Sequence, residues 1–134
     1  MLKRFTILLL LAACLPLCGC KKDAEINSIV ADLDTFTIEL VKKVESAPNP
    51  SAGVDDAQKY FDSKKADLTA KMTTLKGIRG YQASEETKQK MTKSVFDDVT
   101  RVAGLQLKYI GIRDKAFKPK LDKLIKDYTD LFKL

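Results

Sequence analysis

Three pairs of adjacent carboxylates are the residues of this chain best suited by type to acid–base chemistry or to metal binding. They are Asp55-Asp56, Glu85-Glu86 and Asp97-Asp98. Neighbouring positions on a helix point about 100° apart, so such a pair forms no pocket by itself. No Asp-x-Asp-x-Asp-Gly loop accompanies the pairs, as a calcium site would require. We therefore expect these carboxylates to match helix dipoles or to lie on solvated faces.

The chain contains no histidine, which removes the usual general base, the usual proton shuttle and the commonest metal ligand. Histidine-dependent serine catalysis, di-iron bundle centres and histidine-ligated haem are therefore excluded. Glycine loops that cradle phosphate are also missing. An enzyme built on this chain would depend on Asp, Glu, Lys, Arg, Tyr or Ser alone. We expect a non-catalytic protein with no cofactor and no metal.

The three cysteines, Cys14, Cys18 and Cys20, all lie near the beginning of the chain. They follow two cations, Lys3 and Arg4, and an apolar run from residue 5 to residue 17. A run of this length cannot cross ~30 Å of hydrocarbon. A basic start and a short apolar stretch that ends at small residues are typical of an export signal. We therefore expect residues 1–19 to be a signal peptide.

The segment Leu17-Cys18-Gly19-Cys20 resembles the lipobox of bacterial prolipoproteins, in which Leu, a variable residue and a small residue precede Cys. The resemblance implies that the Cys20 thiol is diacylated, that the signal is cut before it, and that residues 20–134 are anchored to a membrane by lipid. In prolipoproteins of this kind, Asp directly after the lipidated Cys implies retention at the inner membrane. This chain has Lys21 there, so the resemblance implies that the protein lies at the outer membrane and faces the periplasm. Leu11-Ala12-Ala13-Cys14 fits the same pattern and remains an alternative, as does an ordinary secretory signal.

Processing at Cys20 would leave no pair of cysteines for a disulfide, so packing alone would stabilise the mature domain. Loss of Lys3 and Arg4 lowers the formal charge by two from +6. An exported and tethered chain is not expected to bind nucleic acid. Weak attraction to anionic lipid head groups fits this charge better.

Apolar residues recur at steps of three and four along four segments of the mature chain, which predicts four amphipathic helices. The predicted ranges are 23–47, 51–76, 84–111 and 119–133. Four helices joined by short loops predict an all-α, up-down-up-down four-helix bundle that forms a single domain over residues 20–134.

The ends of these helices have their own signals. Ser84 is expected to be an N-cap, Pro119 to lie in a first helical turn, and Gly77 to allow a left-handed cap. Asp55 and its neighbour are expected to suit the positive end of the second helix. Gly104 lies inside the third helix, where a close helix–helix approach would explain it.

Two groups of residues are predicted partner contacts. Lys64 and Lys65 break the apolar stripe of the second helix. One interpretation is that the aliphatic parts of these side chains cover apolar surface. The other is that their ammonium groups border a groove that binds an acidic or peptide ligand. The loop of Arg79, Tyr81 and Gln82 combines a guanidinium, an aromatic ring and an amide, a mixture that suits contact with a partner.

These observations predict a membrane-anchored, non-catalytic binding or assembly module of the cell envelope, with an envelope protein as its partner. By size and tether alone it is similar to small helical lipoproteins that act as pilotins, chaperones or immunity proteins. A structural spacer with no specific ligand is the alternative, and a histidine-free enzyme is the lesser one. We expect the start of the first helix, the loop 77–83 and the C-terminus at Leu134 to rest near the membrane, with residues 48–53 and 111–118 at the far end.

Overall fold

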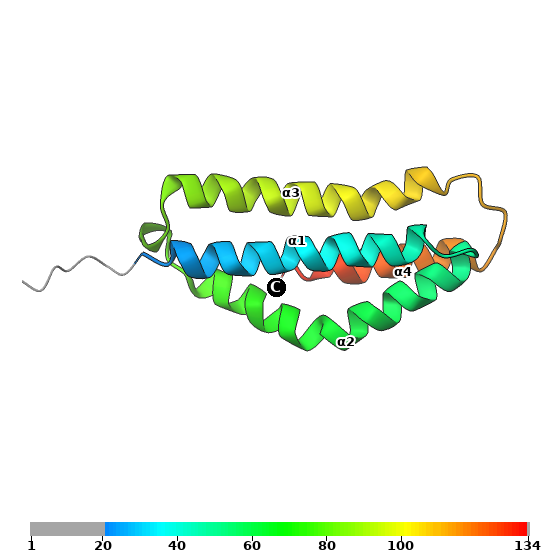
Figure 1. The fold of residues 1–134 in the computed structure, drawn as a ribbon, viewed down its shortest axis with the longest axis horizontal. Helices are drawn as coiled ribbons and strands as arrows, with labels where there is room; N and C mark the ends of the chain where they lie inside the picture. The colour runs from blue at the N-terminus through cyan, green and yellow to red at the C-terminus, as the bar shows by residue number, and fades with distance from the viewer. Residues whose placement is uncertain (1–20, 134) are drawn as a thin grey trace, which may run out of the picture.

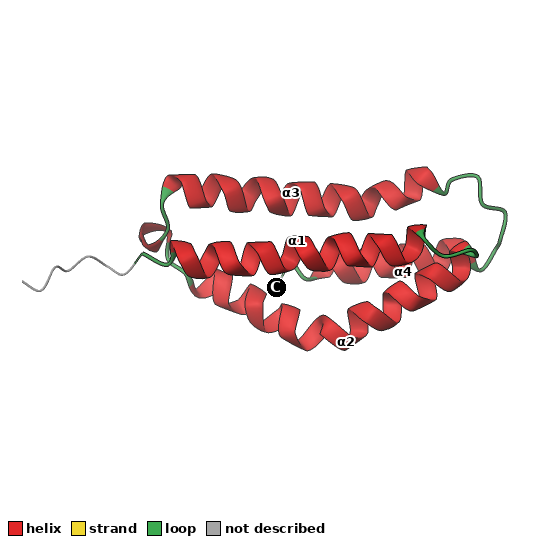
Figure 2. Ribbon diagram, in the orientation of Figure 1, coloured by secondary structure: helices red, strands yellow, loops and turns green. Residues whose placement is uncertain are grey.

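The computed structural model describes residues 21–133, and these residues form helices and no strands (Figures 1 and 2). The helices are α1 (Asp23–Glu45), α2 (Pro50–Gly77), η1 (Gly80–Gln82), α3 (Glu85–Lys108) and α4 (Phe117–Asp130). They run alternately up and down, and both α1 and α4 pack against α2 and α3. The predicted all-α four-helix bundle is confirmed. The expected signal peptide and Cys20 lie outside the described residues.

Two N-caps show why the helices begin where they do. Ser84 Oγ accepts a hydrogen bond from the Thr87 amide at 3.2 Å, as predicted. Asn49 Oδ1 accepts hydrogen bonds from the amides of Ser51 at 2.9 Å and Ala52 at 3.3 Å. Because α2 therefore begins at Pro50, its first turn holds no acidic residue, and the expected role of Asp55 at its positive end is wrong.

The glycines differ from expectation. Gly77 does not adopt a positive φ, so the left-handed cap predicted there is wrong. A Cβ at Gly104 would meet nothing within 4 Å, and the close helix–helix approach expected there is also wrong. The close approach lies at Gly53 instead. A Cβ there would come within 2.8 Å of Ala47 Cβ and of the Val44 carbonyl oxygen, so the absence of a side chain lets α2 begin directly beneath the end of α1.

The core is centred on aromatic rings. Phe36 of α1 stacks on Tyr60, with ring centroids 5.2 Å apart, and on Tyr128 of α4 at 6.4 Å. Tyr128 is 1 % exposed, and its buried hydroxyl is satisfied by Thr37 Oγ1 at 2.6 Å. This hydrogen bond joins the two diagonally placed helices, α1 and α4, across the centre of the bundle.

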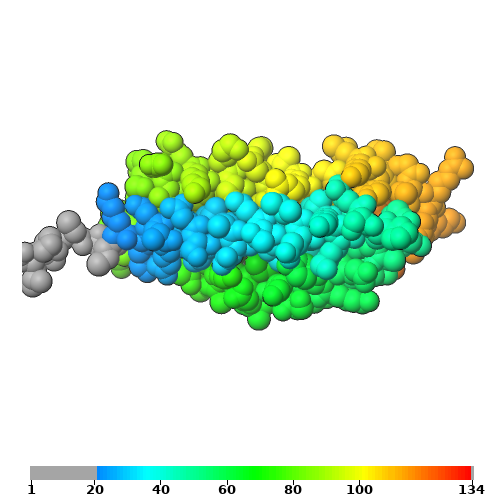
Figure 3. All heavy atoms as spheres, viewed as in Figure 1, coloured from blue at the N-terminus to red at the C-terminus, as the bar shows by residue number. Residues whose placement is uncertain are grey.

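The fourth helix is much shorter than its neighbours. α4 has 14 residues, against 24 in α3 and 28 in α2. α4 therefore stops midway along the bundle (Figure 1). The expectation that Lys133 lies beside the start of α1 is wrong, because α4 covers only about 21 Å of the bundle, against about 35 Å for α1. Leu134 itself lies outside the described residues. Figure 3 shows the face on which α1 lies between α3 and α2.

Candidate functional site

Two hydrogen bonds hold the end of the bundle where α1 begins, one between backbone groups and one from a backbone amide to a side chain. The Lys22 amide donates to the Gln82 carbonyl at 2.7 Å. The Ser84 amide donates to Asp23 Oδ1 at 2.8 Å, and this bond is the largest cause of the lowered pKa of Asp23. The predicted neighbourhood of the first helix and the 77–83 loop is therefore confirmed.

Arg79, Tyr81 and Gln82 have different surroundings in this loop. Gln82 Oε1 accepts a hydrogen bond from the Arg79 amide at 2.9 Å, so its side chain closes the η1 turn. Tyr81 is 68 % exposed, and Arg79 is exposed as well. The residues of this loop that remain open to a partner or a membrane are thus Arg79 and Tyr81.

Lys64 and Lys65 lie midway along α2, where both are exposed. About 14 residues of helix, or ~20 Å, separate them from the loop at Arg79, so the structure does not bring the two predicted contact groups together. Burial alone would raise the pKa of Asp127 on α4. Hydrogen bonds from Lys123 and Gln58 outweigh burial, and the pKa is lowered. The charges of Lys123 and Lys65 lower it further, which places Lys65 near the end of α4.

The opposite end of the bundle exposes a cluster of large apolar side chains. We call it the far-end surface. Leu107 is 76 % exposed, Ile110 83 % and Ile112 38 %. They surround a depression of about 490 Å³ between the end of α3 and the start of α4, whose inner wall includes Tyr109 and Phe117. Large contiguous apolar patches are a feature of interaction sites.

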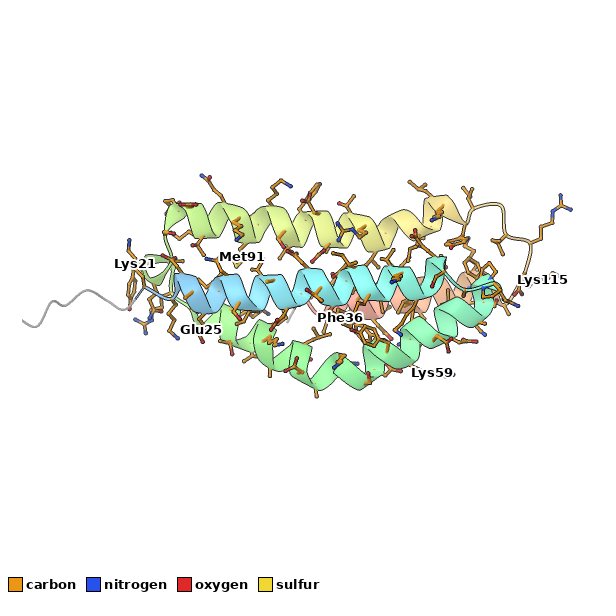
Figure 4. The ribbon with its side chains drawn as sticks, viewed as in Figure 1. Lys21, Glu25, Phe36, Lys59, Met91 and Lys115 are labelled. Carbon is orange, nitrogen blue, oxygen red and sulfur yellow. The ribbon has the colours of Figure 1, made fainter. Side chains whose placement is uncertain are left out.

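The charged residues around the far-end surface are mainly cationic. Arg113, Lys115 and Lys118 are exposed, and within residues 21–133 none of them forms an ion pair. Two carboxylates lie among them. Asp122 lines the depression and accepts a hydrogen bond from Gln106 Nε2 at 2.9 Å, and Asp114 accepts hydrogen bonds from Ser51 Oγ at 2.5 Å and from the Ala116 amide at 2.8 Å. The hydrogen bond from Ser51 is the largest cause of its lowered pKa. Figure 4 places Lys115 at this end and Lys21 at the other.

Sequence reasoning missed the far-end surface. Leu107 and Ile110 fall within the predicted helix 84–111 but off its apolar stripe, and a single off-stripe leucine on a helix carries no signal. The structure ends α3 at Lys108, so that Ile110 and Ile112 come into a turn beside Leu107. The density of large aliphatic residues between 105 and 112 was the signal that could have indicated it.

A second cluster contains two carboxyl groups between α1 and α3. Asp98 is 2 % exposed, so the expectation that the Asp97-Asp98 pair lies on a solvated face is wrong for Asp98. Arg101 Nη1 donates to Asp98 Oδ1 at 3.2 Å, and Ser94 Oγ donates to Asp34. Burial and then a hydrogen bond with Asp34 raise the pKa of Asp98 to about 7. The Asp98 carboxyl therefore holds its proton to a higher pH than an ordinary exposed carboxyl group does.

Both carboxyl groups line a small surface depression. The depression measures about 280 Å³, and its other lining residues are mostly charged side chains from Lys90 to Arg101, although Asp98 is only 2 % exposed. The contact between Asp34 and Asp98 links α1 to α3. The signal for Asp98 was its place in the apolar stripe, three residues after Val95 and four before Val102.

Two further properties concern the described part of the chain only. Within residues 21–133 no group of three His, Cys, Asp or Glu side chains is placed to hold a metal ion. Among the helices described, none is long and apolar enough to cross a bilayer.

Comparison with known proteins finds no match for this chain among protein-family models, curated proteins or solved structures.

Proposed function

We propose that the protein is a membrane-anchored, non-catalytic binding module of the cell envelope, held by lipid on Cys20 and binding a protein partner at the far-end surface. The observation that carries this proposal is the exposure of Leu107, Ile110 and Ile112 at the end of the bundle opposite Lys21. A partner in the aqueous space would reach that end first.

The chemistry of the far-end surface defines the partner. Its apolar centre favours a complementary apolar patch, whose burial would drive association. Its rim of Arg113, Lys115 and Lys118 favours acidic groups around that patch, because charge complementarity steers the encounter and suppresses wrong partners. We therefore propose an envelope protein with an apolar patch bordered by carboxylates.

The anchoring part of the proposal follows from the lipobox and from the short distance between Cys20 and α1. Because α1 begins at Asp23, almost no linker separates the lipid from the bundle. The mature chain is expected to lie at the outer membrane and to face the periplasm. Intact mass of the membrane-extracted protein should begin at Cys20 and include acyl groups, and Cys20→Ala should leave unprocessed precursor. Acylation that survives Cys20→Ala and disappears with Cys14→Ala would refute this assignment.

The binding part is tested by a photocrosslinking amino acid placed at Ile110 in cells. We expect one discrete adduct, which disappears when Leu107→Asp is added because a charge then interrupts the apolar surface. A matched control carries the crosslinker at Ile110 together with Tyr81→Asp, an equally exposed apolar position at the other end, and should retain the adduct. If Leu107→Asp leaves the adduct intact, the far-end surface is not the binding site.

A further inference from the structure

A groove runs along the half of the bundle that α4 does not cover. α4 packs between α2 and α3 and ends at Asp130. It is ten residues shorter than α3, which leaves about 15 Å of α3 without its fourth neighbour, at 1.5 Å per residue. The fourth corner of the bundle is thus filled by a helix in one half and by no described residue in the other.

The groove has the lining of a helix–helix interface. It measures about 570 Å³ and is formed by α2, by α3 and by the turn after α4. The apolar side chains that line it are Met72, Leu75, Met91, Val95, Phe96, Val99 and Phe132. Phe96 is 69 % exposed, although it lies in a groove of apolar neighbours. Methionines such as Met72 and Met91 adapt their shape to a docked surface.

The charges beside the groove are mainly positive. Lys76 lines it, and Lys65 lies on the same helix, seven residues before Met72, where its charge lowers the pKa of Asp127. Over residues 21–133 neither lysine forms an ion pair. The nearby carboxylates are neutralised instead: Glu85 pairs with Lys88 at 2.6 Å, and Asp130 pairs with Lys133 at 3.0 Å. An occupant with acidic groups beside its apolar face would therefore be favoured.

We propose that this groove binds an amphipathic helix of a partner protein, about three turns long, whose apolar stripe is bordered by acidic side chains. Such a helix would lie in line with α4 and complete the fourth corner of the bundle, as in helix-in-groove recognition. The site deepens the proposed function, since it gives the binding module a second contact, but it depends on neither the lipid on Cys20 nor the far-end surface.

The experiment uses the lipidated protein in phosphatidylcholine vesicles and a fluorescent synthetic peptide of about 14 residues. The peptide has leucine at i, i+3, i+4 and i+7 and glutamate at the flanking positions, and a second peptide replaces each glutamate by lysine. Anisotropy is measured against empty vesicles. We expect saturable binding of the glutamate peptide and at least about tenfold weaker binding of the lysine peptide.

Variants then locate the peptide. Phe96→Glu should weaken binding of the glutamate peptide by about tenfold or more, and Lys76→Glu by several-fold. Because both side chains are exposed, neither change should unfold the bundle, which circular dichroism would verify. Lys64→Glu, on the same helix, and Leu107→Glu, on α3 beyond the groove, are matched controls that should bind the peptide unchanged.

Three results would overturn the proposal: no saturable binding of the glutamate peptide, equal affinity for both peptides, or insensitivity to Phe96→Glu. A fourth result would show that the groove binds a lipid chain and not a helix. If a phosphatidylcholine with a photoactivatable acyl chain labels Met72 or Met91 and the glutamate peptide does not compete, a lipid chain fills the groove instead. The Leu107→Glu control alters the far-end surface and not the groove, so it separates the two proposals. If the far-end surface binds no partner, binding of the peptide to the groove is unaffected.

Discussion

At the scale of single residues, Asp98 links the packing of the bundle to pH. Its carboxyl group faces Asp34 on α1 and Arg101 on α3. The Tyr128 hydroxyl of α4 lies near, and burial holds its pKa above the ordinary value, so it stays protonated. The pKa of Asp98 rises from 3.8 to about 7 on folding. The native state therefore binds a proton more tightly than the unfolded chain between these values, and stability falls as pH rises through that window.

Asp98→Asn should remove this pH dependence. We expect the free energy of unfolding of the unaltered protein to decrease from about pH 4 to about pH 7, and that of the variant to stay nearly constant, because an amide cannot lose a proton there. Urea denaturation at several pH values measures both. Asp97→Asn, whose carboxylate pairs with Lys93 toward solvent, is the control and should keep the original slope. A decrease of equal size in Asp98→Asn would assign the effect to another group.

The carboxylates with lowered pKa act in the opposite direction. Asp114 and Asp130 are held ionised mainly by hydrogen bonds from Ser51 and Lys126. Their contribution is complete above the ordinary pKa of 3.8 and is lost as pH falls through the lowered value. Acid therefore destabilises the protein in a range below the one in which Asp98 acts, so the two effects can be measured separately.

At the scale of helices, Gly53 and Gly104 give a matched pair for testing how closely the elements pack. Gly104→Ala should raise the free energy of unfolding by up to about 1 kcal/mol, because alanine favours the helix and the new Cβ meets nothing within 4 Å. Gly53→Ala should lower it, because its Cβ would approach Ala47 and the Val44 carbonyl to 2.8 Å. Thermal unfolding followed by circular dichroism compares them. A stabilising Gly53→Ala would show that α1 and α2 separate easily at this turn.

The helices themselves were largely predictable from the sequence, because apolar periodicity identifies the face that each helix can bury. Periodicity does not show whether another helix covers that face. Every predicted stripe residue of α1 is buried, because α1 has a neighbour along its whole length. In α3 the stripe is buried at Val102 and Leu105 but only half-buried at Val95 and Val99. Periodicity identifies an apolar face, but the length of the opposing helix decides whether that face is covered, and α4 is too short to cover it.

The candidate sites were less predictable, because they depend on contacts between segments far apart in the chain. Asp34 carries no signal until α3 brings Asp98 beside it. The far-end surface depends on where α3 ends. The loop of Arg79 and Tyr81 was identified by composition, and its place beside Lys22 followed from topology alone. Lys65 was identified from its break in the stripe, but the groove near it required the early end of α4.

At the scale of the whole molecule, the bundle has two chemically distinct ends. Lys21, Lys22 and Arg79 lie where α1 begins, a position that would suit anionic head groups at about 1 kcal/mol per close charge. The far-end surface lies at the other end, beyond helices such as α2, whose 28 residues span about 42 Å. Lipid on Cys20 would thus hold the first end at the bilayer and carry the apolar surface well away from it.

Spin labels at the two ends test this orientation on the lipidated protein in vesicles. Processing at Cys20 removes Cys14 and Cys18, so Tyr81→Cys and Lys115→Cys would each provide the one free thiol for labelling. The label at residue 81 should be shielded from a water-soluble nickel relaxation agent by the membrane surface, and the label at residue 115 should be fully accessible, because the bundle separates them by about a helix length. Asn49→Cys, on the turn beside Lys115, is a second far-end position that should match residue 115. Equal accessibility at residues 81 and 115 would mean that the bundle lies flat on the bilayer, and the far-end surface would then be close to lipid rather than presented to a partner.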